Sequence, residues 1–176
     1  MTISSTKGLR DAGISGTIKH FALNNQESNR RDVNSVCSER AIREIYLKSF
    51  EMAVKAGNVL SIMTAYNPIN SHWCASNYDL NTTVLRGEWK FNGFLMTDWQ
   101  AEMNDVVEGG EKSFQKTRDM IRSQNDLYMI VGGMGGAEYN SLDDNTEETI
   151  KNGELTIGEL QRSVINLLNY LLKEIQ

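Results

Sequence analysis

Six side chains able to bind or react with a ligand lie near the ends of three short apolar segments, residues 14–21, 59–66 and 93–98. They supply a cation, an imidazole, a thioether, a phenol, a carboxylate and an indole. The cation and imidazole can hold hydroxyl groups, the indole can pack on an apolar sugar face, and the carboxylate can face an anomeric carbon. The set therefore suits a carbohydrate. Its members are Lys19, His20, Met63, Tyr66, Asp98 and Trp99.

Each of these side chains also has an ordinary structural explanation. Asp98 could cap a helix, Lys19 could be solvated, and His20 could be a hydrogen-bonded core residue. Tyr66 and Trp99 could be packing residues. The argument for a site is that all of them follow successive strands at the same end. This pattern alone indicates a binding site and does not identify a reaction.

Strand-length apolar segments alternate with helical patterns along most of the chain. Four strands are expected, over residues 14–21, 59–66, 93–98 and 126–131. Helices are expected over residues 39–55, 82–89 and 112–122, because apolar residues there recur every three or four positions. In the first of these helices Ile45 belongs to the buried stripe, and Ser38 is expected to cap the start. This alternation predicts an α/β fold with a parallel sheet. Ligands bind beyond the carboxyl ends of such strands, so the six side chains are expected on one rim.

Four βα units make half of a (β/α)8 barrel, which typically needs about 250 residues. We therefore expect the 176-residue chain to be a single partial TIM-type barrel domain, residues 1–176. Its βα units would occupy about residues 10–135 and a helical segment about 141–176. That segment reads as two helices. The second begins with a capping-box pattern, Thr156-Ile-Gly-Glu159, and carries an apolar face. An open half-barrel exposes strand edges and apolar side chains, which favours association.

Composition argues against several classes of protein. The net charge is −5 without a basic stripe, which disfavours nucleic-acid binding, and no apolar run approaches the ~18 residues of a membrane helix. Residues 1–8 lack the apolar stretch of a signal peptide, so a cytoplasmic location is expected. Cys37 and Cys74 form no CxxC motif and read as reduced thiols. His20 and His72 lack metal-ligand spacing, so neither metal nor cofactor is expected.

Several collinear stretches resemble glycoside hydrolase family 3. Lys19-His-Phe-Ala-Leu-Asn-Asn-Gln-Glu-Ser-Asn-Arg30 resembles the KHFxxNNQExxR signature of that family's β-glucosidases. Glu39–Leu47 and Met63–Asn67 resemble the next helix and the next strand end. Leu85–Trp99 resembles the block that carries the family's nucleophilic aspartate. The stretches occur in the family's order over roughly residues 10–105, which is far more specific than any one of them.

The resemblance implies a retaining exo-β-glucosidase that acts on terminal non-reducing β-D-glucosyl residues without a cofactor. Asp98 would be the nucleophile and form a glycosyl-enzyme intermediate, with Lys19 nearby favouring its ionised form. Lys19 and His20 would hold hydroxyls of a small β-glucoside or oligosaccharide, and Arg30 would order its loop. Met63 and Tyr66 would help shape the first subsite, with the Tyr66 hydroxyl near the nucleophile, and Trp99 would form part of its wall.

The same resemblance implies parts that this chain does not contain. The family's subsite uses an aspartate and an arginine from the first half of the barrel, and its acid/base glutamate comes from an α/β sandwich domain. The chain resembles the second half of the barrel, and its tail resembles the branch in which the barrel comes last. We expect it to need the missing parts, or self-association, for activity. The alternatives are a β-xylosidase of the same family and a non-catalytic sugar-binding remnant.

Overall fold

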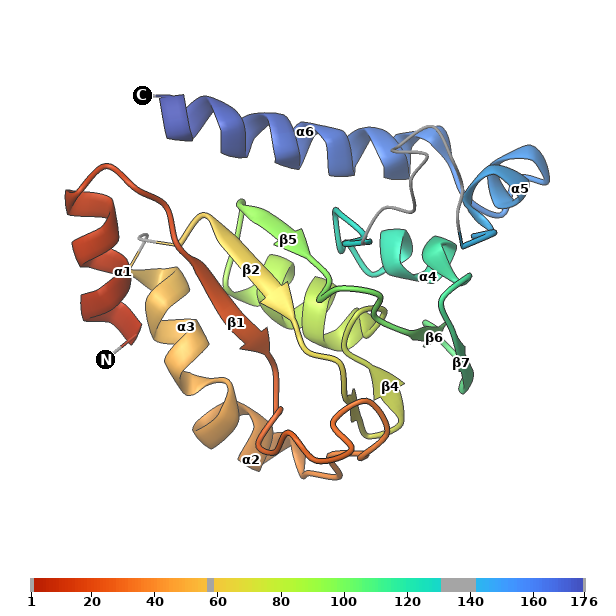
Figure 1. The fold of residues 1–176 in the computed structure, drawn as a ribbon, viewed down its shortest axis with the longest axis horizontal. Coiled ribbons are helices and arrows are strands. Elements are labelled where there is room, and N and C mark those ends of the chain that lie inside the picture. Colours follow the sequence, from red (N-terminus) through yellow and green to blue (C-terminus); the bar gives the residue numbers. More distant parts are fainter. Residues whose placement is uncertain (1, 57–58, 131–141, 176) are drawn as a thin grey trace.

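The computed structural model describes residues 2–56, 59–130 and 142–175 (Figure 1). Its α-helices are α1 (Thr2–Asp11), α2 (Glu39–Ala41), α3 (Lys48–Lys55), α4 (Thr117–Arg122), α5 (Thr146–Lys151) and α6 (Ile157–Ile175). Two π-helical segments are η1 (Ile42–Tyr46) and η2 (Asp79–Glu88). The strands are β1 (Thr17–Phe21), β2 (Ser61–Thr64), β3 (Pro68–Ile69), β4 (His72–Trp73), β5 (Phe94–Met96), β6 (Met103–Asp105) and β7 (Gly109–Ser113).

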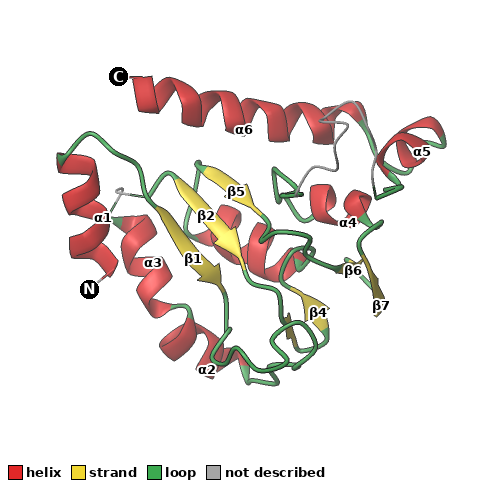
Figure 2. Ribbon diagram, in the orientation of Figure 1, coloured by secondary structure: helices red, strands yellow, loops and turns green. Residues whose placement is uncertain are grey.

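A parallel sheet in the order β1-β2-β5 forms the centre of the fold (Figure 2). Ile62 on the middle strand pairs with Ile18 on one side and with Leu95 on the other. The three strands are those predicted, each shorter than its apolar segment. Because all three run in the same direction, their carboxyl ends lie at one edge of the sheet. The fold is α/β, as predicted.

The prediction of a fourth strand over residues 126–131 was wrong for its described part, residues 126–130. There the chain forms a single parallel bridge, between Leu127 and Met96. Thr97 donates its N–H to the carbonyl of Leu127, but Met129 donates its N–H to the Thr97 hydroxyl at 2.9 Å. A side chain thus takes the place of a backbone acceptor, which stops the ladder from continuing. Residues 131–141 lie outside the described part of the chain.

The single helix predicted over residues 39–55 is divided into α2, η1 and α3. Ser38 caps its start as predicted, and its hydroxyl accepts the N–H of Ala41 at 3.3 Å. A π-helical turn holds more residues than an α-helical one, so it rotates the apolar face of the helix. Ile45, predicted on the buried stripe, is therefore 67% exposed, while Leu47 is buried.

Other elements differ from the prediction in their bounds. The helix expected over residues 82–89 is the longer π-helical η2. The helix expected over residues 112–122 begins only at Thr117, because Gly109–Ser113 pairs with β6 in an antiparallel hairpin. Helix α1 and the β3–β4 hairpin were not predicted. Within that hairpin, Asn70 and Ser71 both have positive φ, which makes the tight turn.

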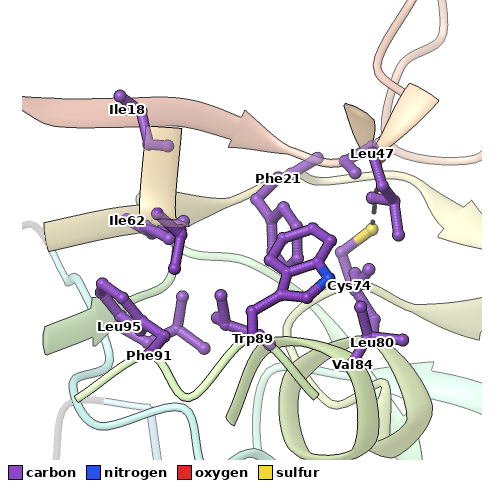
Figure 3. Close-up of a cluster of buried hydrophobic side chains, with 14 of the residues drawn as sticks. Ile18, Phe21, Leu47, Ile62, Cys74, Leu80, Val84, Trp89, Phe91 and Leu95 are labelled. Carbon is purple, nitrogen blue, oxygen red and sulfur yellow. Dashed lines mark hydrogen bonds between the residues drawn. The ribbon is translucent and has the colours of Figure 1, made fainter. Parts of the chain in front are cut away.

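The main hydrophobic core lies between the sheet and the helices α3, η1 and η2 (Figure 3). Phe21, fully buried at the end of β1, packs edge-on against Phe50 at 5.1 Å and Trp89 at 6.0 Å between ring centroids. Burying side chains of this kind contributes roughly 1.5–3 kcal/mol each. Cys37 and Cys74 are free thiols, as predicted. Burial raises the pKa of Cys74 to about 12, so it behaves as an apolar core residue.

The two C-terminal helices are present as α5 and α6, and α6 runs along one side of the molecule (Figure 1). The capping box forms as predicted: Glu159 accepts the N–H of Thr156 at 2.8 Å and donates its own N–H to the Thr156 hydroxyl at 3.3 Å. Much of the predicted apolar face is not covered. Its exposed members are Val164, Leu168, Leu171 and Leu172. Among the described residues, no helix combines the length and apolarity needed to cross a membrane.

Candidate active site

A buried carboxylate follows directly after β5, at the carboxyl edge of the sheet. Asp98 is only 7% exposed. One of its oxygens, Oδ1, accepts the N–H of Trp99 at 2.8 Å, and the other, Oδ2, lies 3.3 Å from Nε2 of His20. His20 comes from β1 and Asp98 follows β5, the strands on either side of β2. A backbone donor and an imidazole from another strand therefore border the two oxygens of this carboxylate.

His20 faces Asp98 as a neutral imidazole at neutral pH. Burial lowers the pKa of His20, and the charge of Asp98 opposes that shift. The nearby cations Lys19 and Arg30 lower the pKa further. The imidazole therefore lies against the carboxylate, with Nε2 3.3 Å from Oδ2, without carrying a full charge. Asp98 is thereby oriented without being neutralised by a full ion pair.

Tyr66 lies beside the same carboxylate, two residues beyond the end of β2. Its hydroxyl donates to the backbone carbonyl of Trp99 at 2.5 Å. Burial, followed by the negative charge of Asp98, raises the pKa of Tyr66 above its ordinary value. The phenol therefore stays protonated at neutral pH and serves as a hydrogen-bond donor. The structure places the Tyr66 hydroxyl near Asp98, where the family resemblance predicted it.

The other predicted residues differ in how closely they approach the carboxylate. Met63 is buried within β2 and pairs in register with Met96 on β5. Trp99 is 41% exposed, so its indole is open to a ligand. Lys19 has an exposed side chain, and its charge reaches the site through its effect on the pKa of His20. Within the described residues, the basic side chain recorded in contact with the Asp98 carboxylate is His20 rather than Lys19.

Arg31 was missed by the sequence analysis, although it touches two of the predicted residues. Its guanidinium lies 3.9 Å from the ring centroid of Tyr66 and donates to the carbonyls of Gln100 at 2.8 Å and Trp99 at 3.4 Å. The signal for it was the Arg30-Arg31 pair, the only basic doublet near the motif. Arg30 itself pairs with Glu27 in the same loop, an arrangement suited to ordering that loop.

A cavity of about 800 Å³ lies elsewhere, among η1, η2 and α6. None of the six predicted residues lines it. A cavity of about 220 Å³ lies beside the loop after β1 and includes Arg30. The described part of the chain contains no group of three or more His, Cys, Asp or Glu side chains placed to hold a metal ion. The six predicted side chains at the strand ends therefore lie outside both of these cavities.

Comparison with known proteins identifies the family. Residues 1–170 match the family model described as the glycosyl hydrolase family 3 N terminal domain. The chain belongs to glycosyl hydrolase family 3. The match names the family's N-terminal domain. That this chain is the second half of the barrel, and that it belongs to the branch in which the barrel comes last, remain predictions.

Similar family 3 proteins are β-glucosidases. A β-glucosidase of Ruminococcus albus is 45% identical over 172 residues, which are 98% of this chain and 17% of that protein. The crystal structure of a β-glucosidase from Paenibacillus barengoltzii matches 98% of this chain and 18% of its own, with 59% identity and a TM-score of 0.94. β-Glucosidase 3B of Thermotoga neapolitana in complex with glucose matches 97% of this chain and 22% of its own, with 37% identity and a TM-score of 0.80. The chain thus spans about a fifth of the length of these relatives.

Proposed function

We propose that this chain supplies the nucleophile and part of the first sugar subsite of a retaining exo-β-glucosidase. The observation that carries the proposal is the buried Asp98 carboxylate, held at the carboxyl edge of the sheet by His20 and the N–H of Trp99. The β-glucosidase names of the relatives support it, as does the T. neapolitana structure with glucose. The β-xylosidase alternative has no such support among these relatives.

The proposed reaction is a double displacement at the anomeric carbon. An oxygen of Asp98 attacks that carbon, the glycosidic C–O bond breaks, and the leaving oxygen departs with its electron pair and takes up a proton. Water then attacks the anomeric carbon of the glycosyl ester, gives up a proton, and releases glucose with Asp98 restored. Oδ2 faces the neutral His20, whereas Oδ1 already accepts a backbone hydrogen bond. We assign the attack to Oδ2.

The neighbouring side chains would bind the sugar. Lys19 is exposed next to His20, so its ammonium is free to reach a sugar hydroxyl. The half-exposed indole of Trp99 offers an apolar surface for one face of the ring. Tyr66, bonded to the Trp99 carbonyl, fixes the backbone that carries both the indole and the carboxylate. Met63 would contribute to the subsite floor.

The rest of the active site would come from outside this chain. We propose that the chain acts as the second half of a TIM-type barrel, with the acid/base glutamate on a sandwich domain that precedes the barrel. Two features support an incomplete barrel: β1 lies at the edge of its sheet, and α6 exposes an apolar face. Self-association of two copies would cover the same surfaces.

The test is the release of dinitrophenol from an activated aryl β-glucoside. Such a leaving group hardly needs an acid, so the assay measures the nucleophile separately from the absent glutamate. We expect any turnover by the chain to fall by about a thousandfold or more in Asp98→Asn. Asp79→Asn, an exposed position on η2, is the matched control and should keep its activity. Equal activity in Asp98→Asn and the parent would contradict the proposal.

The second candidate is a non-catalytic sugar-binding fragment, which the small share of the relatives' length favours. A folded chain that binds glucose but releases no dinitrophenol would support it. Glucose binding is read as a change in the fluorescence of the partly exposed Trp99, with Trp99→Phe as the control. An aryl β-xyloside in the same assay tests the β-xylosidase alternative.

A further inference from the structure

We infer that Arg31 is a positioning residue, one that holds Tyr66 and the backbone after Asp98 in a single arrangement. The inference rests on the proposed function only for its consequence in catalysis. From the loop after β1, the Arg31 guanidinium donates hydrogen bonds to two consecutive carbonyls, those of Trp99 and Gln100, at 3.4 and 2.8 Å. The same guanidinium lies 3.9 Å from the centre of the Tyr66 ring. One side chain therefore touches both groups that border the carboxylate.

This set of contacts needs a guanidinium. The planar fork presents several N–H groups in one plane and leaves its face free to stack on an aromatic ring, whereas a lysine ammonium is a point charge that does not stack. Hydrogen bonds from a charged donor are also the stronger ones. Arg30 lies over the same ring at 4.7 Å but is bonded to Glu27, within its own loop. Arg31 therefore joins two loops, whereas Arg30 orders one.

Arg31 is itself anchored at the backbone. The indole N–H of Trp73 donates to the Arg31 carbonyl at 3.0 Å. On the opposite side, the N–H groups of Thr97 and Gln100 donate to the carbonyls of Leu127 and Met129 at 3.0 and 2.8 Å. Residues 97–100 are thus held on one side by the segment after α4 and on the other by Arg31. Removing the guanidinium would remove the hydrogen bonds from Arg31 and leave those to Leu127 and Met129 in place.

The consequence falls on Tyr66 and Asp98. Tyr66 donates to the Trp99 carbonyl, which is also an acceptor for Arg31, and the N–H of Trp99 donates to Asp98. A shift of the Trp99 backbone would therefore move the Tyr66 hydroxyl and the Asp98 carboxylate together. A misplacement of even about 1 Å near reacting atoms can be costly for catalysis.

The test follows Tyr66 directly, by the Cζ resonance of labelled tyrosine, with Tyr66→Phe assigning the signal. We expect Arg31→Met to shift this resonance at neutral pH. The cation of Arg31 lowers the pKa of Tyr66, so the variant should also titrate at higher pH. Arg31→Lys should give a smaller change. Arg40→Met is the matched control, because Arg40 is exposed on α2 and pairs only locally with Glu44, and its Tyr66 signal should not move.

Turnover of the dinitrophenyl β-glucoside gives the catalytic consequence, an expected loss of about tenfold in Arg31→Met with partial recovery in Arg31→Lys. A folded Arg31→Met with an unchanged Tyr66 resonance and pKa would overturn the inference. If Arg31→Met does not fold, an unchanged Tyr66 signal in Arg31→Lys would overturn it. A parent chain without turnover would count against the proposed function alone, since the Tyr66 resonance still decides the role of Arg31.

Discussion

The strand ends around Asp98 and the C-terminal helix α6 differ in how much of their environment this chain provides. The carboxylate is buried and contacts His20 of β1 and the N–H of Trp99, whose carbonyl accepts a hydrogen bond from Tyr66 after β2. Helix α6 is joined to the rest mainly by isolated contacts, such as the Phe94–Tyr170 ring pair and the hydrogen bond from Asn166 to Asp126. Leu160 near its start packs against the cluster that contains Met120 and Ile121 of α4, but Val164, Leu168, Leu171 and Leu172 remain exposed. The chain thus provides the immediate setting of the proposed nucleophile without completing the packing of its outer layer.

The two regions differ because the sheet is stabilised by contacts within this chain, whereas an outer helix of a barrel also needs neighbouring helices. Three parallel strands bond to one another within the chain, and their side chains meet in one core. Once this sheet forms, its strands fix the positions of the residues at its carboxyl edge. A helix on the outside of a barrel, in contrast, is buried by neighbours on both sides. If those neighbours belong to a longer protein, the helix shows an apolar face here.

The largest expected effect on the free energy of unfolding is at Phe21, in the core beside the strand ends. Phe21→Ala removes a fully buried ring that packs on Phe50 and Trp89, and should lower the free energy of unfolding by about 3–5 kcal/mol. Phe114→Ala, at a position 38% exposed, is the matched control and should cost much less. Urea unfolding measures both. A loss in Phe21→Ala no larger than in Phe114→Ala would show that the sheet region is not the stable part.

A smaller effect is expected in how the stability of the fold depends on pH. The pKa of His20 is lowered in the folded state, chiefly by burial. The unfolded chain therefore binds a proton more readily, and the stability that neutral His20 contributes is fully present above about pH 6.5 and lost as the pH falls through its lower folded pKa. His20→Gln should lose less stability than the parent between pH 7 and 5. Thermal unfolding across this range tests it, and identical slopes in both proteins would contradict the prediction.

The smallest effect on stability is expected at α6. Leu168→Gln replaces a side chain that is 52% exposed and should change the free energy of unfolding by no more than about 0.5 kcal/mol. Its effect should appear in association instead. If copies of the chain meet through this face, sedimentation at increasing concentration will show less association in Leu168→Gln than in the parent. A large loss of stability would mean that α6 is already packed, and the contrast with the strand ends would fail.

The sequence predicted the elements whose cause is local. The three strands, the Ser38 cap and the Thr156–Glu159 capping box follow from short patterns of apolar and capping residues. The π-helical turns of η1 and η2 were not predicted, because a helical pattern of apolar residues does not distinguish a wider turn. Helix α1 was missed for a different reason: Thr2–Asp11 has few apolar residues, and it packs beside α3.

The site was predicted in the same uneven way. The sequence placed the six side chains on successive strand ends, and the parallel sheet brings His20, Tyr66 and Trp99 to Asp98. It did not predict the contacts of Arg31, because that side chain is placed by the conformation of the loop after β1 rather than by strand order. Arg31 reaches residues 99 and 100 across almost seventy positions of sequence, a contact that no short pattern contains.

The central claim is that Asp98 is the nucleophile, and its most direct test is to trap the covalent intermediate. A dinitrophenyl β-glucoside with fluorine in place of the 2-hydroxyl forms the glycosyl ester but hydrolyses it slowly. Mass spectrometry of the digested chain should then show one fluoroglucosyl group on the peptide that contains Asp98, and none in Asp98→Asn. A chain that turns over the parent glucoside but carries the label on another residue would contradict the account.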